Sequence, residues 1–540
     1  MLTLASFLFF TALVGGLVYA MTRNDKMGDS DAYFLGGRSL GAWVIAGSLV
    51  LTNLSTEHLI GLNGDAYRHT IAVMAWETTA ALAMVLMALF FLPRYLRRGF
   101  TTIPQFLAER YDQQTATIAT MLFLLSYILA ILPVVLLSGA TGLESLFDLS
   151  GHLGITRAQG VWLSVWGVGT IGSLYAIFGG LRAVALSDTI NGVGFLVIGL
   201  LVPVLGLMAI GDGNLFAGTT KLYASEYRKF DITGDEPGSF LPFGVLFTGM
   251  IVNQIFFWCA NQQIVQRTFG AKSLKEGQKG VLIAAGFKLL GPVAVVLPGI
   301  IAFHMFSDTL TGEDAYLRAY PELVKAVLPP YLLGFFAAVM VGAILSTFNS
   351  VLNSSATLFS KDIYATMINR DPTQRQLVVT GRICSIVLAI GAMATAPLID
   401  SEGGLYNYLQ KINATFFGPL LAVLLLGFFT RSVSSLAAKF GLIGGPLAFY
   451  LLVFEFGDTV QSLLRAIFGN ADDVHFLHFL ALIFIATAAA MLIISRFRPA
   501  QKIYDPPSAM VVDLAPWRYA RPVSAILGLL TVGCYWILAQ

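Results

Sequence analysis

The chain has 540 residues, of which 56% are apolar and 12% are charged, and its formal net charge is +2. Soluble proteins carry charge on about a quarter of their residues, so this composition cannot cover a water-soluble body of this size. A nucleic-acid-binding protein needs a concentrated basic surface, which so small a net charge does not indicate. The composition therefore predicts an integral membrane protein whose partners include the lipid bilayer and no nucleic acid.

Apolar runs of the length that crosses a bilayer recur along the whole chain. A spanning helix needs ~20 mostly apolar residues. The runs are continuous rather than alternating, which favours helices over a β-barrel. We predict an all-α integral membrane protein with about 14 transmembrane helices and no appended soluble domain. The predicted spans are 2–21, 41–62, 70–93, 116–147, 158–177, 184–210, 240–265, 280–305, 328–360, 377–397, 405–429, 434–454, 475–495 and 519–538.

The distribution of basic residues predicts the orientation. The run 2–21 has no basic stretch before it, whereas Arg23 and Lys26 follow it. This order favours a retained helix with its N-terminus outside over a signal peptide. In that orientation, 23 of the 33 Lys and Arg residues fall in cytoplasmic connections and eight fall in outer ones. We therefore expect a multi-pass protein of the cell inner (plasma) membrane with both termini on the periplasmic side.

The middle of the second span is unusually polar. Six of the seven residues from Thr52 to His58 are polar, and they include Glu57. Polar and charged side chains are costly inside a bilayer, so a lipid-facing helix would not carry them. One interpretation is a broken helix that lines a polar cavity and leaves backbone carbonyls free to hold a cation. The other is a hydrogen-bonded seam between two packed helices.

Two further charges lie in the middle of predicted spans. Glu77 is in the third span and Lys288 is in the eighth. They are either a buried ion pair that fixes the packing, or cavity side chains that hydrogen-bond the polar groups of a substrate. Gln254 in the seventh span and Gln410 in the eleventh are candidates for the same cavity.

Hydroxyl side chains form a stripe on the ninth span. Ser346, Asn349 and Ser350 share one helical face, with Thr347 beside them. Neutral oxygen ligands suit a monovalent hard cation, although hydroxyls in helices also bond back to the preceding turn. Asp188, at the start of the sixth span, is either an exposed carboxylate at a helix start or part of an ion exit or second cation site.

Short motifs along the chain match a known family. They are residues 33–40 (YFLGGRSL), 46–49 (AGSL), 53–55 (NLS), 102–107 (TIPQFL), 179–184 (GGLRAV), 266–268 (QRT) and 352–354 (LNS). On these residues the chain resembles the sodium:solute symporter family nearly end to end, and it is most similar to the sodium/sugar branch of galactose and glucose carriers. The resemblance implies a single transporter domain over 1–540 with a LeuT-type core of two inverted five-helix repeats, broken helices in spans 2 and 7, and peripheral helices. The implied repeats are 41–210 and 240–429, and the implied peripheral helices are 2–21 and 434–538.

The resemblance also implies the residues of the sites. Sodium is expected on the backbone oxygens of Leu51, Leu54 and Ala343 and the hydroxyls of Ser346 and Thr347. The implied sugar contacts are Asn53, His58, Glu77, Gln254, Lys288 and Gln410, with Phe257 as the aromatic inner gate. The implied outer gate is Leu62, Trp76 and Tyr406. For the second sodium site of some relatives, Asp188 and Ser350 match the pattern, whereas Asn349 departs from it.

Departures from the sugar carriers concern the pocket, where Ala80 replaces a Ser contact and three other positions differ. Phe257 stands where the family has a Tyr, so the hydroxyl that would reach Asn53 is missing. Gln254 replaces an Asn and is longer. His58 matches the animal glucose carriers, whereas the bacterial galactose carriers have Gln. These departures predict a sugar-like pocket that is tuned to a different sugar.

The expected function is secondary active symport, in which sodium drives the import of a sugar, a hexose or a derivative, by alternating access. The protein is expected to act as a monomer and not as an enzyme. The alternatives are a sodium symporter for a sialic acid, polyol or amino acid, and, less strongly, an intramembrane sensor or enzyme. The sequence has no Walker lysine motif, no recognisable nucleophile or metal set, and no stretch that could fold as a signalling domain.

Overall fold

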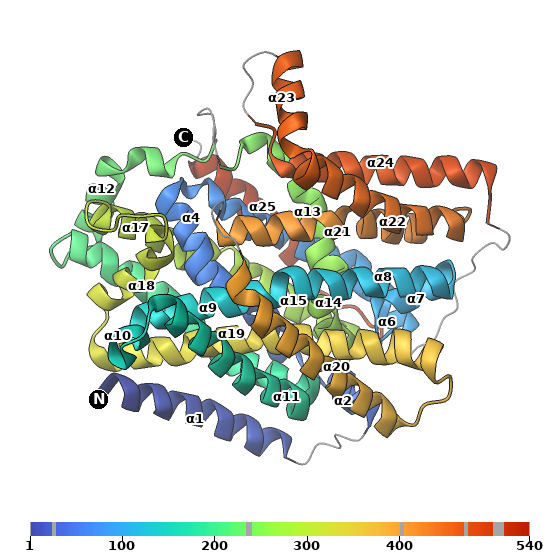
Figure 1. Ribbon diagram of the computed structural model, residues 1–540, viewed down its shortest axis with the longest axis horizontal. Helices are drawn as coiled ribbons and strands as arrows, with labels where there is room; N and C mark the ends of the chain where they lie inside the picture. The colour runs from blue at the N-terminus through green and yellow to red at the C-terminus, as the bar shows by residue number, and fades with distance from the viewer. Residues whose placement is uncertain are drawn as a thin grey trace.

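The computed structural model describes residues 2–23, 29–233, 240–399, 404–468, 473–500 and 512–538. Within these ranges the protein is helical and contains no β-strand. Most of the long helices run roughly along one direction, which is horizontal in Figure 1. The start of α1 and the end of α25 both lie toward the left-hand side of that view. The all-α prediction is confirmed.

The first part of the chain forms twelve helices. They are α1 (Leu2–Thr22), α2 (Ser30–Leu35), α3 (Ala42–Asn53), α4 (Asn63–Arg68), α5 (Ala75–Leu86), α6 (Leu92–Arg98), α7 (Ile103–Arg110), α8 (Gln113–Ser126), α9 (Leu132–Phe147), α10 (Leu149–Leu153), α11 (Arg157–Ile210) and α12 (Leu215–Ser225). Short π-helical or 3-10 segments join several of them, such as η2 (Glu57–Leu62) between α3 and α4.

Thirteen more helices follow among the described residues. They are α13 (Gly249–Cys259), α14 (Gln262–Phe269), α15 (Leu274–Lys288), α16 (Gly291–Val295), α17 (Leu297–Phe306), α18 (Ala315–Val327), α19 (Pro330–Leu358), α20 (Gln374–Thr395), α21 (Leu405–Phe429), α22 (Ser435–Tyr450), α23 (Gly457–Phe468), α24 (Phe476–Phe497) and α25 (Ala520–Leu538).

Ten helical stretches of the described chain are long and apolar enough to cross a membrane, and there are eleven if the bent pair Leu274–Lys288 and Gly291–Phe306 is one span. Three of the fourteen predicted spans are not among them. The apolar helices in spans 41–62 and 240–265 are the short α3 and α13, and span 158–177 is the first part of α11. Length and composition therefore identify fewer spans than predicted. In two of the three cases the apolar helix is short, because it ends at Asn53 or at Cys259.

The predicted connection 178–183 is absent, because α11 runs through it with a single break at Gly180. Gly180 has φ 62°, in the left-handed region that favours glycine. The backbone oxygen of Tyr33 lies so close to this glycine that a Cβ there would stand 3.0 Å from it. The Tyr33 hydroxyl also donates to the backbone oxygen of Ile177 at 3.1 Å. The two predicted spans therefore meet in a tight glycine break that α2 packs against.

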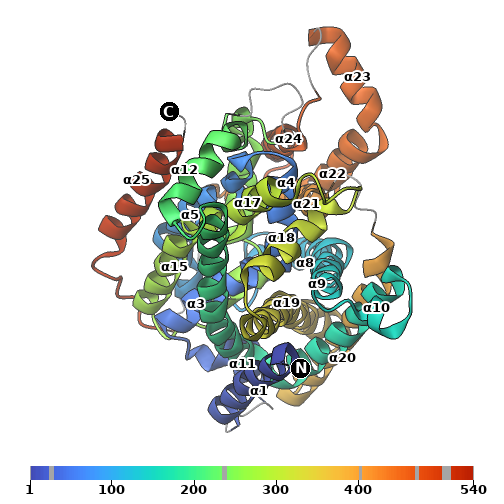
Figure 2. The ribbon, with the colours of Figure 1, turned by 90° about the vertical axis from the view of Figure 1, so that its left-hand side faces the viewer.

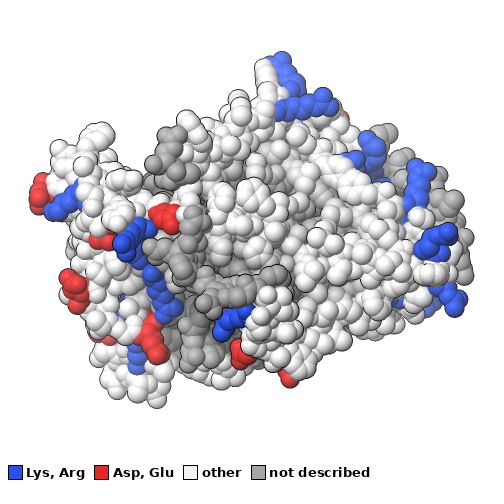
Figure 3. All heavy atoms as spheres, turned by 90° about the horizontal axis from the view of Figure 1, so that it is seen from above, with Lys and Arg blue, Asp and Glu red and all other residues white. Residues whose placement is uncertain are grey.

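The helices divide into an inner group and a peripheral group. Of the most apolar stretch in each helix, 72% is buried in α19 and in α21, but 6% in α1 and 22% in α25. Figure 2 shows α1, α20 and α25 at the rim of the bundle. On the face seen in Figure 3, a wide uncharged area separates a left-hand part with both charge signs from a right-hand end where Lys and Arg gather. An uncharged belt between two charged ends is the surface that a bilayer requires.

Candidate functional site

The site begins where α3 ends at Asn53 and the chain resumes as η2. Across this interruption, the Ser55 amide donates to the Asn53 oxygen at 2.9 Å and the His58 amide donates to the Ser55 oxygen at 3.1 Å. In a continuous helix these two amides would bond the oxygens of Leu51 and Leu54. The interruption therefore releases these two carbonyl oxygens from helical hydrogen bonding.

The interruption faces the middle of α19. The Ser55 hydroxyl donates to the Ala343 oxygen at 3.1 Å, and the Thr347 hydroxyl donates to the Thr52 oxygen at 2.8 Å. The hydroxyl of Ser346 is buried close to Asp188. Among the described residues this hydroxyl has no hydrogen-bond partner of standard geometry. These neutral oxygens, together with the released carbonyls, are a donor set that fits a sodium ion.

A small polar cavity adjoins this contact, with a volume of about 30 Å³. That is the space of roughly one water molecule, whereas ligand pockets measure roughly 300–1,000 Å³. The cavity must therefore widen before a solute of sugar size enters. Five of the seven predicted substrate residues line it, namely Asn53, His58, Gln254, Phe257 and Gln410.

The other two predicted substrate residues, Glu77 and Lys288, do not line the cavity. The Lys288 ammonium donates to the Glu77 carboxylate and to the amide oxygen of Asn53, and both charged side chains are 1% exposed. The ring of Trp258 lies 5.7 Å from the Lys288 nitrogen. The pair therefore lies behind Asn53 and positions its amide. Of the two interpretations of Glu77 and Lys288 that the sequence left open, the arrangement matches the buried ion pair.

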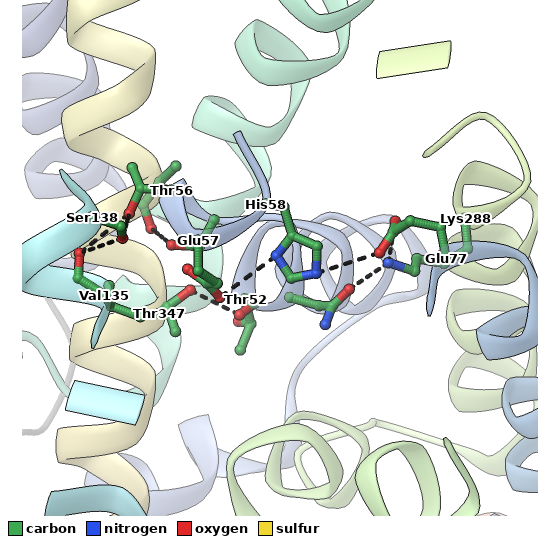
Figure 4. A network of polar contacts seen from close by, with 12 residues as sticks. Thr52, Thr56, Glu57, His58, Glu77, Val135, Ser138, Lys288 and Thr347 are labelled. Atoms are coloured by element: carbon green, nitrogen blue, oxygen red, sulfur yellow. Dashed lines mark hydrogen bonds and ion pairs between the residues drawn. The ribbon is translucent and has the colours of Figure 1, made fainter. Parts of the chain in front are cut away.

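His58 connects this ion pair to Glu57. Its Nδ1 lies 3.6 Å from a Glu57 oxygen and its Nε2 lies 3.3 Å from a Glu77 oxygen. Figure 4 shows the imidazole ring between the two carboxylates, with Lys288 beyond Glu77. Glu57 comes from η2 and lines the cavity, although the sequence analysis did not assign it to a site.

Aromatic rings close the cavity near His58. The ring of Tyr406 lies edge-on to His58, with 5.3 Å between centroids, and edge-on to Trp76, with 5.7 Å. Trp76 and Tyr406 line the cavity, whereas Leu62 is fully buried in the core and does not. The structure therefore brings two of the three predicted outer-gate residues together over the pocket. Phe257 lines the same cavity from α13.

The region of the possible second sodium site contains a guanidinium group. Asp188 is 1% exposed rather than a surface carboxylate, and it accepts a hydrogen bond from Ser48 at 2.6 Å. Arg267 donates to Ser48 at 3.1 Å and also to the hydroxyl of Ser350. The amide oxygen of Asn349 lies beside Gly172 on α11 instead. Of the three predicted residues, Asp188 and Ser350 meet around Arg267 and Asn349 does not.

Sequence reasoning missed several residues of the site. The additional polar and aromatic residues that line the cavity are Thr52, Glu57, Asn253, Trp258, Gln263 and Asn413. The sequence analysis also counted Arg267 among the residues of a cytoplasmic connection. In the structure Arg267 is on α14 and its side chain is completely buried. The available signal was the run Gln262–Arg267, which places three glutamines beside the arginine next to an apolar span.

Comparison with known proteins identifies what this arrangement resembles. The model of the sodium:solute symporter family matches residues 33–445. The uncharacterized symporter YidK of Escherichia coli (strain K12) is 42% identical over 100% of this chain and 91% of its own length. The sodium/glucose cotransporter of Vibrio parahaemolyticus is 34% identical over 82% of this chain and 84% of its own. The solved structure of a Na⁺-coupled sialic acid symporter in a substrate-bound outward-open state has a TM-score of 0.76 at 20% identity, over 95% of this chain and 99% of that one.

Proposed function

Because this chain belongs to the sodium:solute symporter family, we propose that it uses sodium to import a neutral sugar, a hexose or a derivative, by alternating access. The observation that carries the proposal is the contact between the α3 interruption and α19, which gathers neutral oxygens beside a polar cavity. An ion and a solute that bind at adjacent sites support each other's binding if each stabilises the same conformation.

The chemistry of the cavity supports a neutral polyhydroxylated substrate. Amide side chains such as Asn53, Gln254 and Gln410 both donate and accept hydrogen bonds, as sugar hydroxyl groups require. Phe257 offers an apolar ring face for stacking. Among the described residues no Arg lines the cavity, and the Lys288 ammonium is already paired with Glu77. A carboxylate substrate therefore finds no free cationic partner in it.

The proposed cycle begins with sodium bound from outside at the oxygens of Leu51, Leu54, Ala343, Ser346 and Thr347. These oxygens come from the end of α3, from the residues just after it, and from α19. An ion bound between them therefore favours one position of α3 relative to α19. The rings of Trp76 and Tyr406 then move apart for the solute and close behind it. Displacement of Phe257 opens the path to the cytoplasm.

The proposed architecture is that of the family core. It has about 14 spans with inverted repeats over 41–210 and 240–429, and interruptions in spans 2 and 7 at the ends of α3 and α13. The protein acts as a monomer in the inner membrane with both termini outside. The predominance of Lys and Arg at one end of the molecule supports that orientation.

Proteoliposomes prepared without internal sodium test the proposal. Labelled D-glucose or D-galactose is supplied outside with sodium chloride or with choline chloride at equal ionic strength. We expect uptake that requires sodium and that collapses when an ionophore dissipates the sodium gradient. Equal uptake in choline would contradict sodium coupling. Sodium-induced thermal stabilisation without uptake of either hexose would contradict the hexose and direct the screen to polyols, sialic acids and amino acids.

A further inference from the structure

Four ionisable side chains gather beside the small polar cavity, two of them lining it and two standing behind its wall. Glu57 and His58 come from η2, Glu77 from α5 and Lys288 from α15. Their exposed fractions are 5% or less. Charges buried this deeply are tolerated only when they compensate one another. The charge of each of the four side chains is therefore constrained by the charges of the other three.

With both carboxylates ionised, the charges of this group balance only if the imidazole carries a proton. Two carboxylates and one ammonium leave a net negative charge when His58 is neutral. One carboxyl oxygen of Glu57 has no hydrogen-bond partner among the described residues, so no donor there stabilises its charge. An imidazolium in the same place brings the sum to zero.

The geometry around the ring favours the same state. Nδ1 faces Glu57 at 3.6 Å and Nε2 faces Glu77 at 3.3 Å. A neutral imidazole has one N–H and one lone pair, so one carboxylate would face a lone pair. An imidazolium presents its positive charge to both carboxylates at ion-pair distance, although Nδ1 makes no hydrogen bond of standard geometry among the described residues.

No other described residue offers the ring a competing charge. The edge of the neutral Tyr406 ring on α21 packs against it. The helices α4, α9, α16 and α18 also pack on η2. Helix α4 carries the buried Asp65 and also Arg68, but within the described residues only Glu57 and Glu77 act on the charge of the imidazole. Lys288 lies beyond Glu77 and is paired with it. The two carboxylates therefore determine the charge state of His58.

We propose that the central cavity contains a proton-binding site at His58, between Glu57 and Glu77, and that the transporter binds its solute with this proton in place. The inference rests on the proposed function only in treating this cavity as the place where the solute binds. The bound proton holds the Glu57 side chain at the cavity wall, where its unpartnered oxygen is available to accept a hydrogen bond from a substrate hydroxyl.

The proton site can be tested without a known substrate. Purified protein is unfolded by heat between pH 5.5 and 9 in choline chloride, with the proton as the only ligand. A proton held at this site in the folded protein contributes stability that is present at low pH and is lost as the pH rises and the proton leaves. Relative to His58→Gln, the folded-to-unfolded ratio of the unmodified protein should fall by up to about tenfold per pH unit in that window.

Two further variants make the result specific. Glu57→Gln removes one carboxylate and should move the loss to lower pH, and it replaces His58→Gln if that variant does not fold. His152→Gln changes an exposed histidine on α10 and should follow the unmodified protein. If the thermal stability of the unmodified protein and of both pocket variants changes with pH in the same way, the proton site is overturned, even if sodium-dependent uptake is observed. A His58-dependent profile without sodium-dependent uptake would overturn the proposed function and leave the proton site standing.

Discussion

The ammonium of Lys288 on α15 and the carboxylate of Glu77 on α5 form an ion pair in which each side chain is 1% exposed. Lys288 also holds the amide oxygen of Asn53 at the end of α3. The pair therefore joins three helical segments at the wall of the cavity. A change in either member should affect both folding stability and the position of a residue that lines the pocket.

We predict that Lys288→Met destabilises the protein by about 3–5 kcal/mol, because removing one partner of a buried pair leaves the other charge uncompensated. Thermal unfolding of the purified protein measures the change. The double variant Lys288→Met/Glu77→Gln should recover most of the lost stability, since it removes both charges. Equal stability of the single and double variants would show that Glu77 does not need its partner. Solute uptake should stay low in both, because Asn53 loses its anchor.

Substitutions of the hydroxyls that face the α3 interruption should weaken sodium binding. Ser346→Ala and Thr347→Ala each remove a neutral oxygen, which we expect to raise the sodium concentration for half-maximal thermal stabilisation by about tenfold. Ser355→Ala is the matched control, because this buried hydroxyl on the same helix bonds back to the Val351 oxygen at 2.8 Å. A similar shift in all three variants would remove the cation site from this contact.

Much of the helical framework could be predicted from apolar runs, because the bilayer imposes length and composition on every span. The predictions failed where helices are interrupted. Gly180 allows α11 to pass through a predicted connection, and such a backbone break leaves no trace in hydropathy. The helix α14 shows the opposite failure, since most of its residues are polar by sequence and yet all are buried in the protein.

The candidate site was predictable where a charge or an amide lies inside an apolar run, as with His58, Glu77 and Gln254. Residues that reach the site from interrupted segments were not predictable, because their position depends on how the helices pack. Gln263 lines the cavity and Arg267 lies beside Ser48 and Ser350. The choice between an ion pair and two separate ligands for Glu77 and Lys288 also required the three-dimensional arrangement.

We predict that His69 makes the folding stability of the protein sensitive to acid. Burial and the nearby charges of Lys229 and Arg68 lower the pKa of His69 from 6.5 to about 4. The folded protein thus binds this proton less tightly than the unfolded chain, so stability is full above pH 6.5 and decreases as pH falls toward 4. His69→Phe keeps a ring to stack on Phe240, which lies 4.3 Å from His69 between centroids, and should flatten the decrease. Unchanged acid sensitivity of the variant in thermal unfolding would contradict this role.

The guanidinium of Arg267 predicts that one sodium ion moves per solute. Arg267 donates to Ser350, one of the residues of the possible second sodium site, and it shares the hydroxyls of Ser48 and Thr52 with Asp188. A cation is therefore already present among these oxygens, and a second sodium ion would have to displace it or share its space, which like charges oppose. Simultaneous uptake of ²²Na⁺ and labelled solute, at a membrane potential clamped by potassium and valinomycin, measures the ratio.

We expect a sodium-to-solute ratio near one and a sodium activation curve without cooperativity. Ser350→Ala should leave the ratio unchanged, because its hydroxyl contacts Arg267 rather than a transported ion, whereas Ser346→Ala should move the midpoint of the activation curve. A ratio of two that returns to one in Ser350→Ala would mean that Arg267 leaves this position during transport and that sodium takes its place beside Asp188. The ratios measured for the unmodified protein and for Ser350→Ala thus decide whether the positive charge beside Asp188 is that of Arg267 or that of a second transported sodium ion.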